Sequence, residues 1–195
     1  MRKIFIGVFV IILLMFIWIF SSYNQLIRLD EKVEAAWSQV LNQYKRRFDL
    51  INSLVETVRG ATDYEGSLLK EIVSLRAEAN KTLNVGDLAT NPEAMAAFQK
   101  SQAALSDGLG RLFMVIENYP NLKASENFFT LQSQLEGTEN RITVARKDYI
   151  EAIRLYNTRI RMIPTAWIAD YIGLERRQTF DIPIEEQKRP EIRFK

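Results

Sequence analysis

The sequence contains neither cysteine nor histidine. Without cysteine there is no disulfide, no iron–sulfur cluster and no thiolate zinc site, and this absence suits either side of a membrane. Without histidine there is no Ser-His triad, no Glu-x-x-His di-iron site and no His-x-x-x-His zinc site. Any catalysis would therefore depend on carboxylates, lysine, tyrosine or serine alone.

Neither sign of charge dominates the chain. Its 26 Lys and Arg stand against 24 Asp and Glu, and Arg2 and Lys3 account for the net charge of +2. The remaining charges balance without forming a basic stripe, so the electrostatic footprint of a nucleic-acid-binding protein is missing. We predict no nucleic-acid partner.

Glycine and proline are absent between Val8 and Arg59, and this stretch begins inside the apolar run of residues 4–20. No charge follows that run until Arg28. A helix needs roughly 20 residues to cross the hydrocarbon of a bilayer, so we predict a transmembrane anchor at residues 1–23. A cleaved signal peptide is the alternative, but the run is long and bulky residues stand where a cleavage site needs small ones.

Basic residues on the two sides of the anchor favour one orientation. Arg2 and Lys3 precede the apolar run, whereas Arg28 and Lys32 follow it beside two acids. By the positive-inside rule we expect a cytoplasmic N-terminus and a periplasmic or other extracytoplasmic domain. A cytoplasmic domain is the alternative.

Apolar residues recur at gaps of three and four after the anchor, which predicts that the membrane helix continues as the first helix of a bundle. This apolar seam holds for more than four heptads and consists of Leu26, Leu29, Val33, Trp37, Val40, Tyr44, Phe48, Ile51, Val55 and Val58. Residues between Gly60 and Gly66 break the pattern, and a shorter amphipathic helix is predicted over 68–82.

A loop and another long helix are predicted in the middle of the chain. The loop covers residues 83–92, where Asn91 is the expected N-cap and Pro92 the first helical residue. The apolar seam of this helix runs to Ile116. The helix stops before Pro120, because proline disfavours the helical conformation in the residue that precedes it.

The last long helix is predicted over 128–163, and Pro164 ends or kinks it. A short apolar helix follows, closed by Gly173. Half of residues 174–195 are charged and two are proline, so we expect a mostly unpacked tail. Within that tail, "TFDIPI" is the segment expected to contact the bundle.

These patterns predict an all-α protein. An N-terminal transmembrane helix runs into an elongated antiparallel four-helix bundle with long first and last helices. The predicted domain organisation is a membrane anchor at 1–23, a helical bundle at 24–173 and a charged tail at 174–195.

Polar residues that suggest a binding site have simpler interpretations. The basic residues within Tyr44–Asp49 ("YKRRFD") are expected on or beside the solvated face, because Tyr44 and Phe48 occupy the seam. No seam position carries an acid, so we predict no metal or cofactor site and no catalytic residue. Gln102 and Thr138 lie in seams and are expected to set helix register or to bind water.

Glycines and aromatic residues inside the helical patterns are interpreted as packing features. Gly108, Gly110 and Gly137 each cost about 1 kcal/mol relative to alanine, so we expect close helix approach at these positions. The aromatic seam is expected in the core rather than in a ligand site, and it contains Trp37, Tyr44, Phe48, Tyr149 and Tyr156.

Three stretches carry a family resemblance, and they read "LDEKVEAAWSQVLNQYKRRFDLINSLVETVRG", "ENYPNLKASENFFTLQSQLEGTENRITVARKDYIEAIRLYNTRIR" and "RQTFD". They resemble the LemA family, in the family's order, from the anchor to about Asp181. The resemblance implies a bacterial inner-membrane protein with an N-terminal anchor and long antiparallel helices. It implies no agreed activity, although family members are associated with membrane remodelling and their genes often neighbour those of membrane metalloproteases.

Three functional hypotheses follow. The first is a single-pass anchored helical scaffold that organises or remodels a membrane without catalysis, with the lipid bilayer and other membrane proteins or copies of itself as partners. The second is a sensor or adaptor bundle that serves a membrane partner such as a metalloprotease. The third is an enzyme that uses carboxylates or tyrosine, for which the sequence offers no acid–base set.

Overall fold

The computed structural model describes residues 2–61, 66–83, 88 and 91–180, and each regular element within these ranges is a helix. The helices in chain order are α1 (Arg2–Ala61), α2 (Ser67–Leu83), α3 (Pro92–Ile116), α4 (Pro120–Lys123), α5 (Glu126–Arg161) and α6 (Thr165–Tyr171). The predicted all-α class and the predicted order of long and short helices are confirmed.

Helix α1 is a single unbroken element of 60 residues, about 90 Å long at 1.5 Å per residue. Its side chains divide it into two halves. Every residue from 2 to 21 is exposed, and we call this stretch the exposed half. Ser22 is the first buried residue, and the stretch 22–60, which packs against the other helices, is the packed half. The predicted continuity from membrane helix to bundle helix is confirmed.

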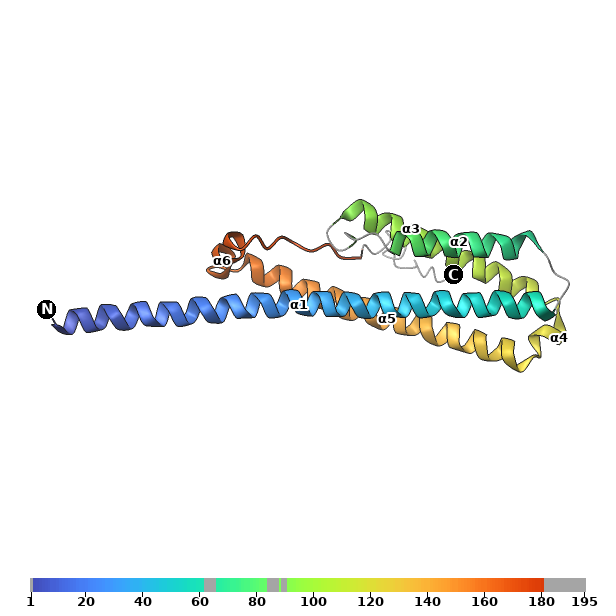
Figure 1. Ribbon diagram of the computed structural model, residues 1–195, viewed down its shortest axis with the longest axis horizontal. Helices are drawn as coiled ribbons and strands as arrows, with labels where there is room; N and C mark the ends of the chain where they lie inside the picture. Colours follow the sequence, from blue (N-terminus) through green and yellow to red (C-terminus); the bar gives the residue numbers. More distant parts are fainter. Residues whose placement is uncertain (1, 62–65, 84–87, 89–90, 181–195) are drawn as a thin grey trace, which may run out of the picture.

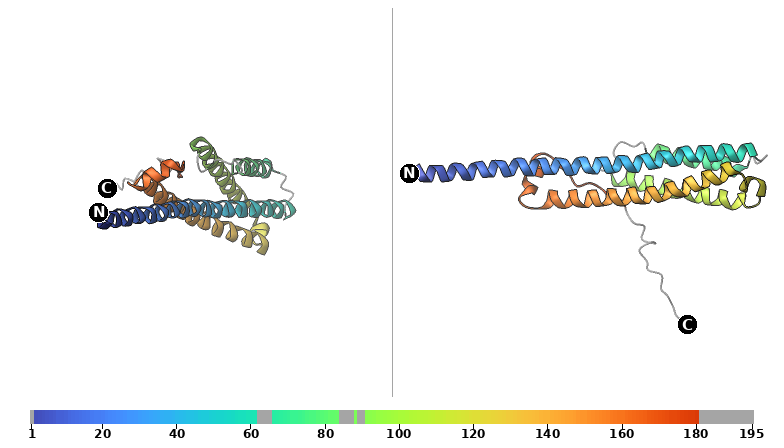
Figure 2. Two further views of the ribbon diagram at one scale, coloured as in Figure 1. Left: turned by 60° about the vertical axis from the view of Figure 1, so that its left-hand side comes forward. Right: turned by 90° about the horizontal axis from the view of Figure 1, so that it is seen from below.

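The bundle consists of two antiparallel pairs. Helix α5 runs back along the packed half of α1, and the hairpin of α2 and α3 lies beside this pair (Figure 1; Figure 2). The predicted seams face one another and form the core, because a stripe of apolar residues at gaps of three and four must be covered by neighbouring helices. The seam side chains of α1 and α5 that are buried include Leu26, Val33, Val40, Tyr44, Phe48, Ile51, Phe128, Leu135, Ile142, Tyr149 and Tyr156.

Local signals place the helix ends where the sequence predicts them. The Asn91 side chain accepts hydrogen bonds from the backbone N–H groups of Glu93 and Ala94, which caps α3. After α6, Gly173 adopts a φ of +71°, and its N–H donates to the Asp170 carbonyl. This left-handed residue closes the helix, as expected of a glycine in the C′ position.

The first residues of the charged tail pack against the bundle. Residues 174–180, which we call the strap, run along α5, and Phe180 is only 3% exposed. The expectation of an unpacked tail is wrong for this part, whereas the expected contact through "TFDIPI" is confirmed at Phe180. Residues 181–195, the predicted break at 62–65 and residues 84–87 and 89–90 of the predicted loop lie outside the described residues.

Candidate functional site

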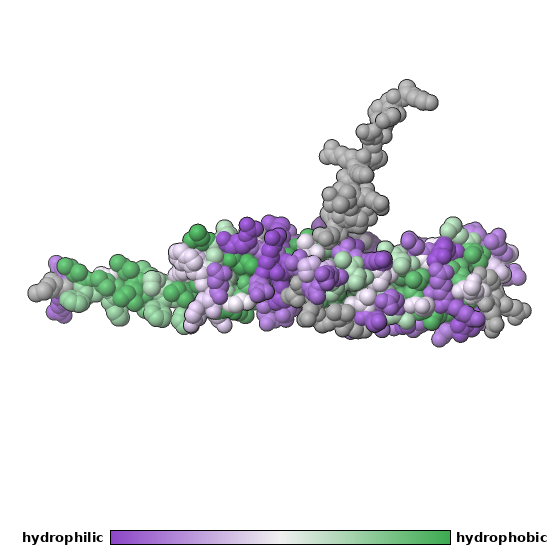
Figure 3. Space-filling model, turned by 90° about the horizontal axis from the view of Figure 1, so that it is seen from above, coloured by the Kyte–Doolittle hydropathy of each residue, from purple (hydrophilic) through white to green (hydrophobic). Residues whose placement is uncertain are grey.

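The two halves of α1 meet in a region with no helix break. The exposed half contains the stretch of the described chain that is long and apolar enough to cross a membrane, and none of that stretch is buried within the protein. Figure 3 shows it as a hydrophobic projection from a largely hydrophilic body. Because the helix continues without glycine or proline into the packed half, the direction of the projection also sets the direction of the bundle.

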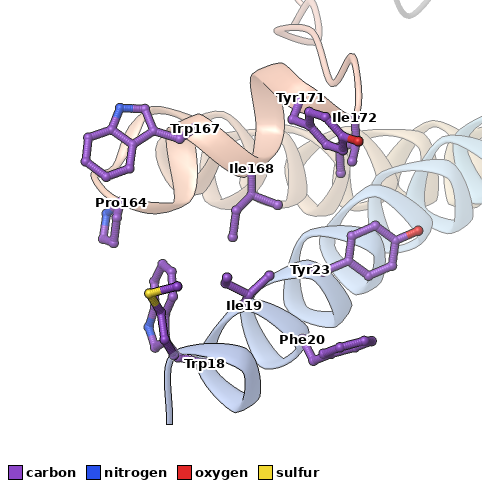
Figure 4. A pocket seen from close by; sticks show the side chains of 10 residues that line it. Trp18, Ile19, Phe20, Tyr23, Pro164, Trp167, Ile168, Tyr171 and Ile172 are labelled. Carbon is purple, nitrogen blue, oxygen red and sulfur yellow. The ribbon is translucent and has the colours of Figure 1, made fainter. Parts of the chain in front are cut away.

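The short helix α6 lies against the end of the exposed half of α1. Ser22 on α1 and Thr165 and Ala169 on α6 are buried, and α6 contacts both α1 and α5. Beside them lies an open apolar groove of about 640 Å³, in which Ile168 points toward Ile19 (Figure 4). The groove is lined by Met15, Trp18, Ile19, Phe20, Tyr23, Pro164, Trp167, Ile168, Tyr171 and Ile172.

Basic side chains surround the level at which α1 enters the bundle. Arg159, near the end of α5, donates a hydrogen bond of 2.6 Å from Nη2 to Gln25 Oε1 on α1. Arg28 and Arg161 are exposed close to this contact in the chain. The junction therefore consists of an apolar groove on the side of the exposed half and, on the side of the bundle, of three arginines with the acids Asp30 and Glu31 shortly after Arg28 in the chain.

The strap holds this junction in place through backbone and side-chain contacts. The Asn157 amide makes two hydrogen bonds with the Arg177 backbone, donating to its carbonyl at 2.9 Å and accepting from its N–H at 3.0 Å. The Arg177 guanidinium lies 2.8 Å from the Asp30 carboxylate, and both side chains are 21% exposed. The Tyr156 hydroxyl donates to the Glu175 carbonyl at 2.9 Å. The strap thus links α5 to α1 on the bundle side of the junction.

The end of the strap closes an aromatic cluster. The Phe180 ring lies 5.6 Å from Tyr149 and 6.0 Å from Trp37, and the Arg146 guanidinium lies 4.5 Å above it. Burial raises the pKa of the Tyr149 hydroxyl to about 12, with the charge of Arg177 opposing the shift. Burial also raises the pKa of Tyr44. These tyrosines are neutral at physiological pH and pack in the core, as predicted for the aromatic seam.

One basic residue of "YKRRFD" lies inside the bundle. Lys45 and Arg46 are exposed as predicted, but Arg47 is only 5% exposed, so the expectation of a solvated side chain is wrong at this position. Its Nη2 donates to Ser106 Oγ on α3 at 2.7 Å, and its Nη1 lies 3.3 Å from Glu139 Oε2 on α5. The spacing on α1 does not reveal these partners, because they lie on other helices.

The two other polar seam residues, Gln102 and Thr138, are buried. Within the described residues no group of three or more Asp or Glu side chains is placed to hold a metal ion. Thr138 is buried and donates to the Gln134 carbonyl of its own helix at 2.7 Å. Gln102 is buried and its Nε2 lies 3.5 Å from the Ala79 carbonyl on α2. The interpretation of these two residues as register-setting or water-bound stays a prediction.

The three helical glycines differ in their surroundings. A Cβ atom on Gly108 would lie 2.9 Å from Leu75 Cδ1 on the neighbouring helix, so the expected close approach is confirmed there. No atom would lie within 4 Å of a Cβ on Gly110 or Gly137. The expectation is therefore wrong at these two positions, which face open space.

The family model described as LemA family matches residues 36–194. The chain belongs to the LemA family. The match covers α1 from Ala36 onward, the α2–α3 hairpin, α5, α6 and the strap. The α1 residues that line the groove, from Met15 to Tyr23, lie before the matched residues.

Curated relatives extend the likeness to magnetosome proteins. The chain is 24% identical over 174 residues to the magnetosome proteins MamQ 1 and MamQ 2 of Paramagnetospirillum magneticum, which covers 81% of this chain and 64% of each relative. It is 24% identical over 151 residues to the protein LemA of Metamycoplasma hominis, with 77% and 65% covered. The chain thus spans less than two thirds of the length of these relatives.

The groove between α1 and α6 is the feature that sequence reasoning missed. The short helix itself is predicted, but its packing against the exposed half of α1 is not. One signal was available in the sequence. The end of the apolar run contains a tryptophan and a tyrosine, Trp18 and Tyr23, and the short helix contains another such pair, Trp167 and Tyr171. These amphipathic aromatic residues are enriched where a protein meets the membrane interface.

Proposed function

We propose that this chain is a single-pass membrane-anchored helical scaffold that organises or remodels a membrane without catalysis. The observation that carries the proposal is the continuity of α1 from an exposed apolar half into a packed half. A continuous helix transmits orientation, so the bundle would stand at a defined angle to the bilayer. From Ser22 to Gly60 the packed half extends about 57 Å, which is nearly twice the hydrocarbon thickness.

Two further features support a stiff joint. Helix α6 braces the end of the exposed half, and the strap links α5 to α1 through Asn157, Arg177 and Asp30. A bundle held in this way suits a spacer or scaffold better than a flexible tether. The cell inner membrane, with the bundle on the extracytoplasmic side, is the location that we propose.

The chemistry of the bundle favours a non-catalytic role. The buried Tyr44, Tyr149 and Tyr156 have raised pKa values because of burial, which moves them away from the range useful for acid–base catalysis near neutral pH. The names of the relatives, magnetosome protein and LemA, denote no enzymatic activity. Bilayer lipid and other membrane proteins or copies of the chain are the partners that this role requires.

The decisive experiment compares two insertions at the joint. Two glycines inserted after Ser22 introduce flexibility, whereas two alanines at the same place change the register equally but preserve the helix. The chain has no cysteine, so a single Asn121→Cys substitution on α4 accepts one fluorophore at the distal end of the bundle. Energy transfer to a lipid dye then reports the height of the bundle above the membrane.

We expect a narrow distribution of heights for the parent and the alanine variant, and a lower mean with a broader distribution for the glycine variant. Overproduction of the glycine variant should also lose the effect of the parent on membrane morphology. If the glycine variant matches the parent in both measurements, the anchor is only a tether and the proposal fails.

A sensor or adaptor role is the second candidate, and exposed apolar residues at the distal end of the bundle favour it. Met114 near the end of α3 and Phe129 near the start of α5 are 66% and 69% exposed. They lie far from the anchor, where a protein is a more suitable partner than lipid. Photo-crosslinking in cells from these positions should capture one specific membrane protein, and capture should stop when the anchor is exchanged for an unrelated one.

A further inference from the structure

The residues around α6 form the densest group of exposed apolar side chains outside the exposed half of α1. Ile163, Trp167 and Tyr171 are 75%, 68% and 91% exposed, and Met162 is exposed beside them. We call residues 162–171 the foot. Its opposite face is buried through Thr165 and Ala169, so the foot has one side packed on the protein and one side that nothing in the chain covers within the described residues.

The position of the foot along α1 sets its depth in the membrane. Arg2 and Lys3 hold the start of the exposed half at one surface, and roughly 20 helical residues then reach the other surface near Tyr23. The α1 residues that line the groove run from Met15 to Tyr23, which is the last 12 Å, approximately, of this span. A helix packed against them lies at the depth of the lipid rather than in water.

We propose that the foot is a second membrane contact, which lies in the leaflet where α1 leaves the bilayer and takes a phospholipid acyl chain into the α1–α6 groove. This inference rests on the proposed function in one respect, namely that the exposed half of α1 spans the membrane. It adds a second point of attachment and a lipid site that the anchor alone does not supply.

The direction of α6 matches this arrangement. Trp167 lies at the Trp18 end of the groove and Tyr171 at the Tyr23 end, so the start of α6 is deeper than its end (Figure 4). Asp170 is the charged residue of α6, and it lies in the shallow last turn where headgroups and water are available. Tryptophan and tyrosine are the side chains preferred at this interface.

The backbone of the foot makes hydrogen bonds that lower the cost of placing it in lipid. Exposed backbone groups are costly in lipid, so a segment that enters it must satisfy them internally. The Ala166 N–H donates to the Met162 carbonyl at 2.8 Å, and the Leu174 N–H donates to the Ala169 carbonyl at 3.0 Å. Pro164 has no N–H to satisfy. Each end of the short helix thus has a backbone hydrogen bond, and the one at its C-terminal end comes from Leu174 of the strap.

Cationic side chains stand at the level expected for phosphate. Arg159 is held at Gln25, two residues beyond the end of the estimated span, and Arg28 follows one turn later on α1. Arginine at this level binds lipid phosphate, and its long side chain reaches the headgroups from slightly deeper positions. The foot, the groove and these arginines together fit a phospholipid, with its chain in the groove and its phosphate at the arginines.

The test uses the full chain in vesicles of phosphatidylcholine and phosphatidylglycerol. Single cysteines replace Trp167 on the foot, Leu14 in the exposed half or Lys45 on the exposed side of the bundle, and each carries a polarity-sensitive fluorophore. We expect the label at 167 to emit further to the blue than the label at 45 and to be quenched several-fold more by lipid with a spin label near the top of its acyl chain. The label at 14 reports the anchor itself.

The outcomes separate this inference from the proposed function. A label in lipid at 14 and in water at 167 overturns the inference and leaves the anchor intact, whereas water at both positions overturns the anchor as well. A label at 167 that is shielded but escapes lipid quenching, and that becomes exposed on dilution into excess lipid, means that a second copy covers the foot and overturns the lipid assignment.

A substitution provides an independent check on the folded protein. Trp167→Glu combined with Tyr171→Glu changes exposed side chains only, so the bundle should melt as the parent does. A fluorophore at Ile163→Cys should then move from a lipid to an aqueous environment, while the label at 14 stays in lipid. If the signal from 163 is unchanged, the aromatic face does not hold the foot in the membrane and the inference fails.

Discussion

The two halves of α1 share one backbone and differ in everything that surrounds it. The exposed half is apolar on all sides from Ile4 to Phe20, and none of these residues is buried. The packed half confines its apolar residues to a seam, and Val33, Val40 and Ile51 in that seam are 0–1% exposed. A helix that is apolar all round suits lipid, whereas a striped helix suits partner helices.

This comparison teaches that helix continuity and helix environment have separate causes. Continuity follows from the composition between Val8 and Arg59, where no proline removes a backbone N–H and no glycine lowers the helix propensity. Environment follows from the arrangement of side chains around the helix. One unbroken helix therefore passes from the exposed half into the packed half. Ser22 and Leu26 are its first buried residues, and residues 23–25 between them are exposed.

The largest expected effect comes from placing the same charge in each half. Val40→Arg buries an unpaired cation in the core and should destabilise the bundle by about 3 kcal/mol or more, a fall in the melting temperature of about 10 °C. Leu14→Arg should leave melting in detergent unchanged but reduce membrane insertion, because a central arginine costs about 2.5–3.5 kcal/mol there. Circular dichroism and membrane fractionation check the pair, and equal melting of the two variants would contradict the division of α1.

A smaller effect is expected where the packed half itself carries a charge. Arg47→Ala removes the contacts with Ser106 and Glu139 and the packing of the arginine side chain, so we expect a loss of about 1–3 kcal/mol in the free energy of unfolding. Its exposed neighbour is the matched control, and Arg46→Ala should change stability by less than about 0.5 kcal/mol. Urea denaturation measures both variants. A loss as large for Arg46→Ala would show that burial does not distinguish these arginines.

The smallest effect extends the contrast between packed and open positions to α3. Gly110→Ala gains helix propensity in open space and should stabilise the protein by up to about 1 kcal/mol. Gly108→Ala adds a methyl group 2.9 Å from Leu75 Cδ1, so the leucine must move and the gain should be absent or reversed. Thermal melting of the two variants side by side provides the measurement. A larger gain for Gly108→Ala would refute the close packing of α2 and α3.

The features of this protein that depend on neighbouring residues could be predicted from the sequence. The extent of α1, the cap at Asn91, the stop before Pro164 and the left-handed Gly173 all follow from a few adjacent residues, and each is confirmed. The interpretation failed at Arg47, which was expected on the solvated face of its own helix. It also failed along the strap, where the charged composition indicated an unpacked segment. Those residues are covered by segments distant in the chain.

By itself, then, the sequence determined the helices, the apolar anchor and the faces that must be buried, because propensity, capping and periodicity are properties of short stretches. Only the tertiary structure decided what covers each face. In the strap Arg177 contacts Asp30, and near the end of α5 Arg159 contacts Gln25; these contacts span 147 and 134 residues. An apolar seam indicates that one face of a helix must be buried. Which segment buries that face depends on how the whole chain folds back on itself.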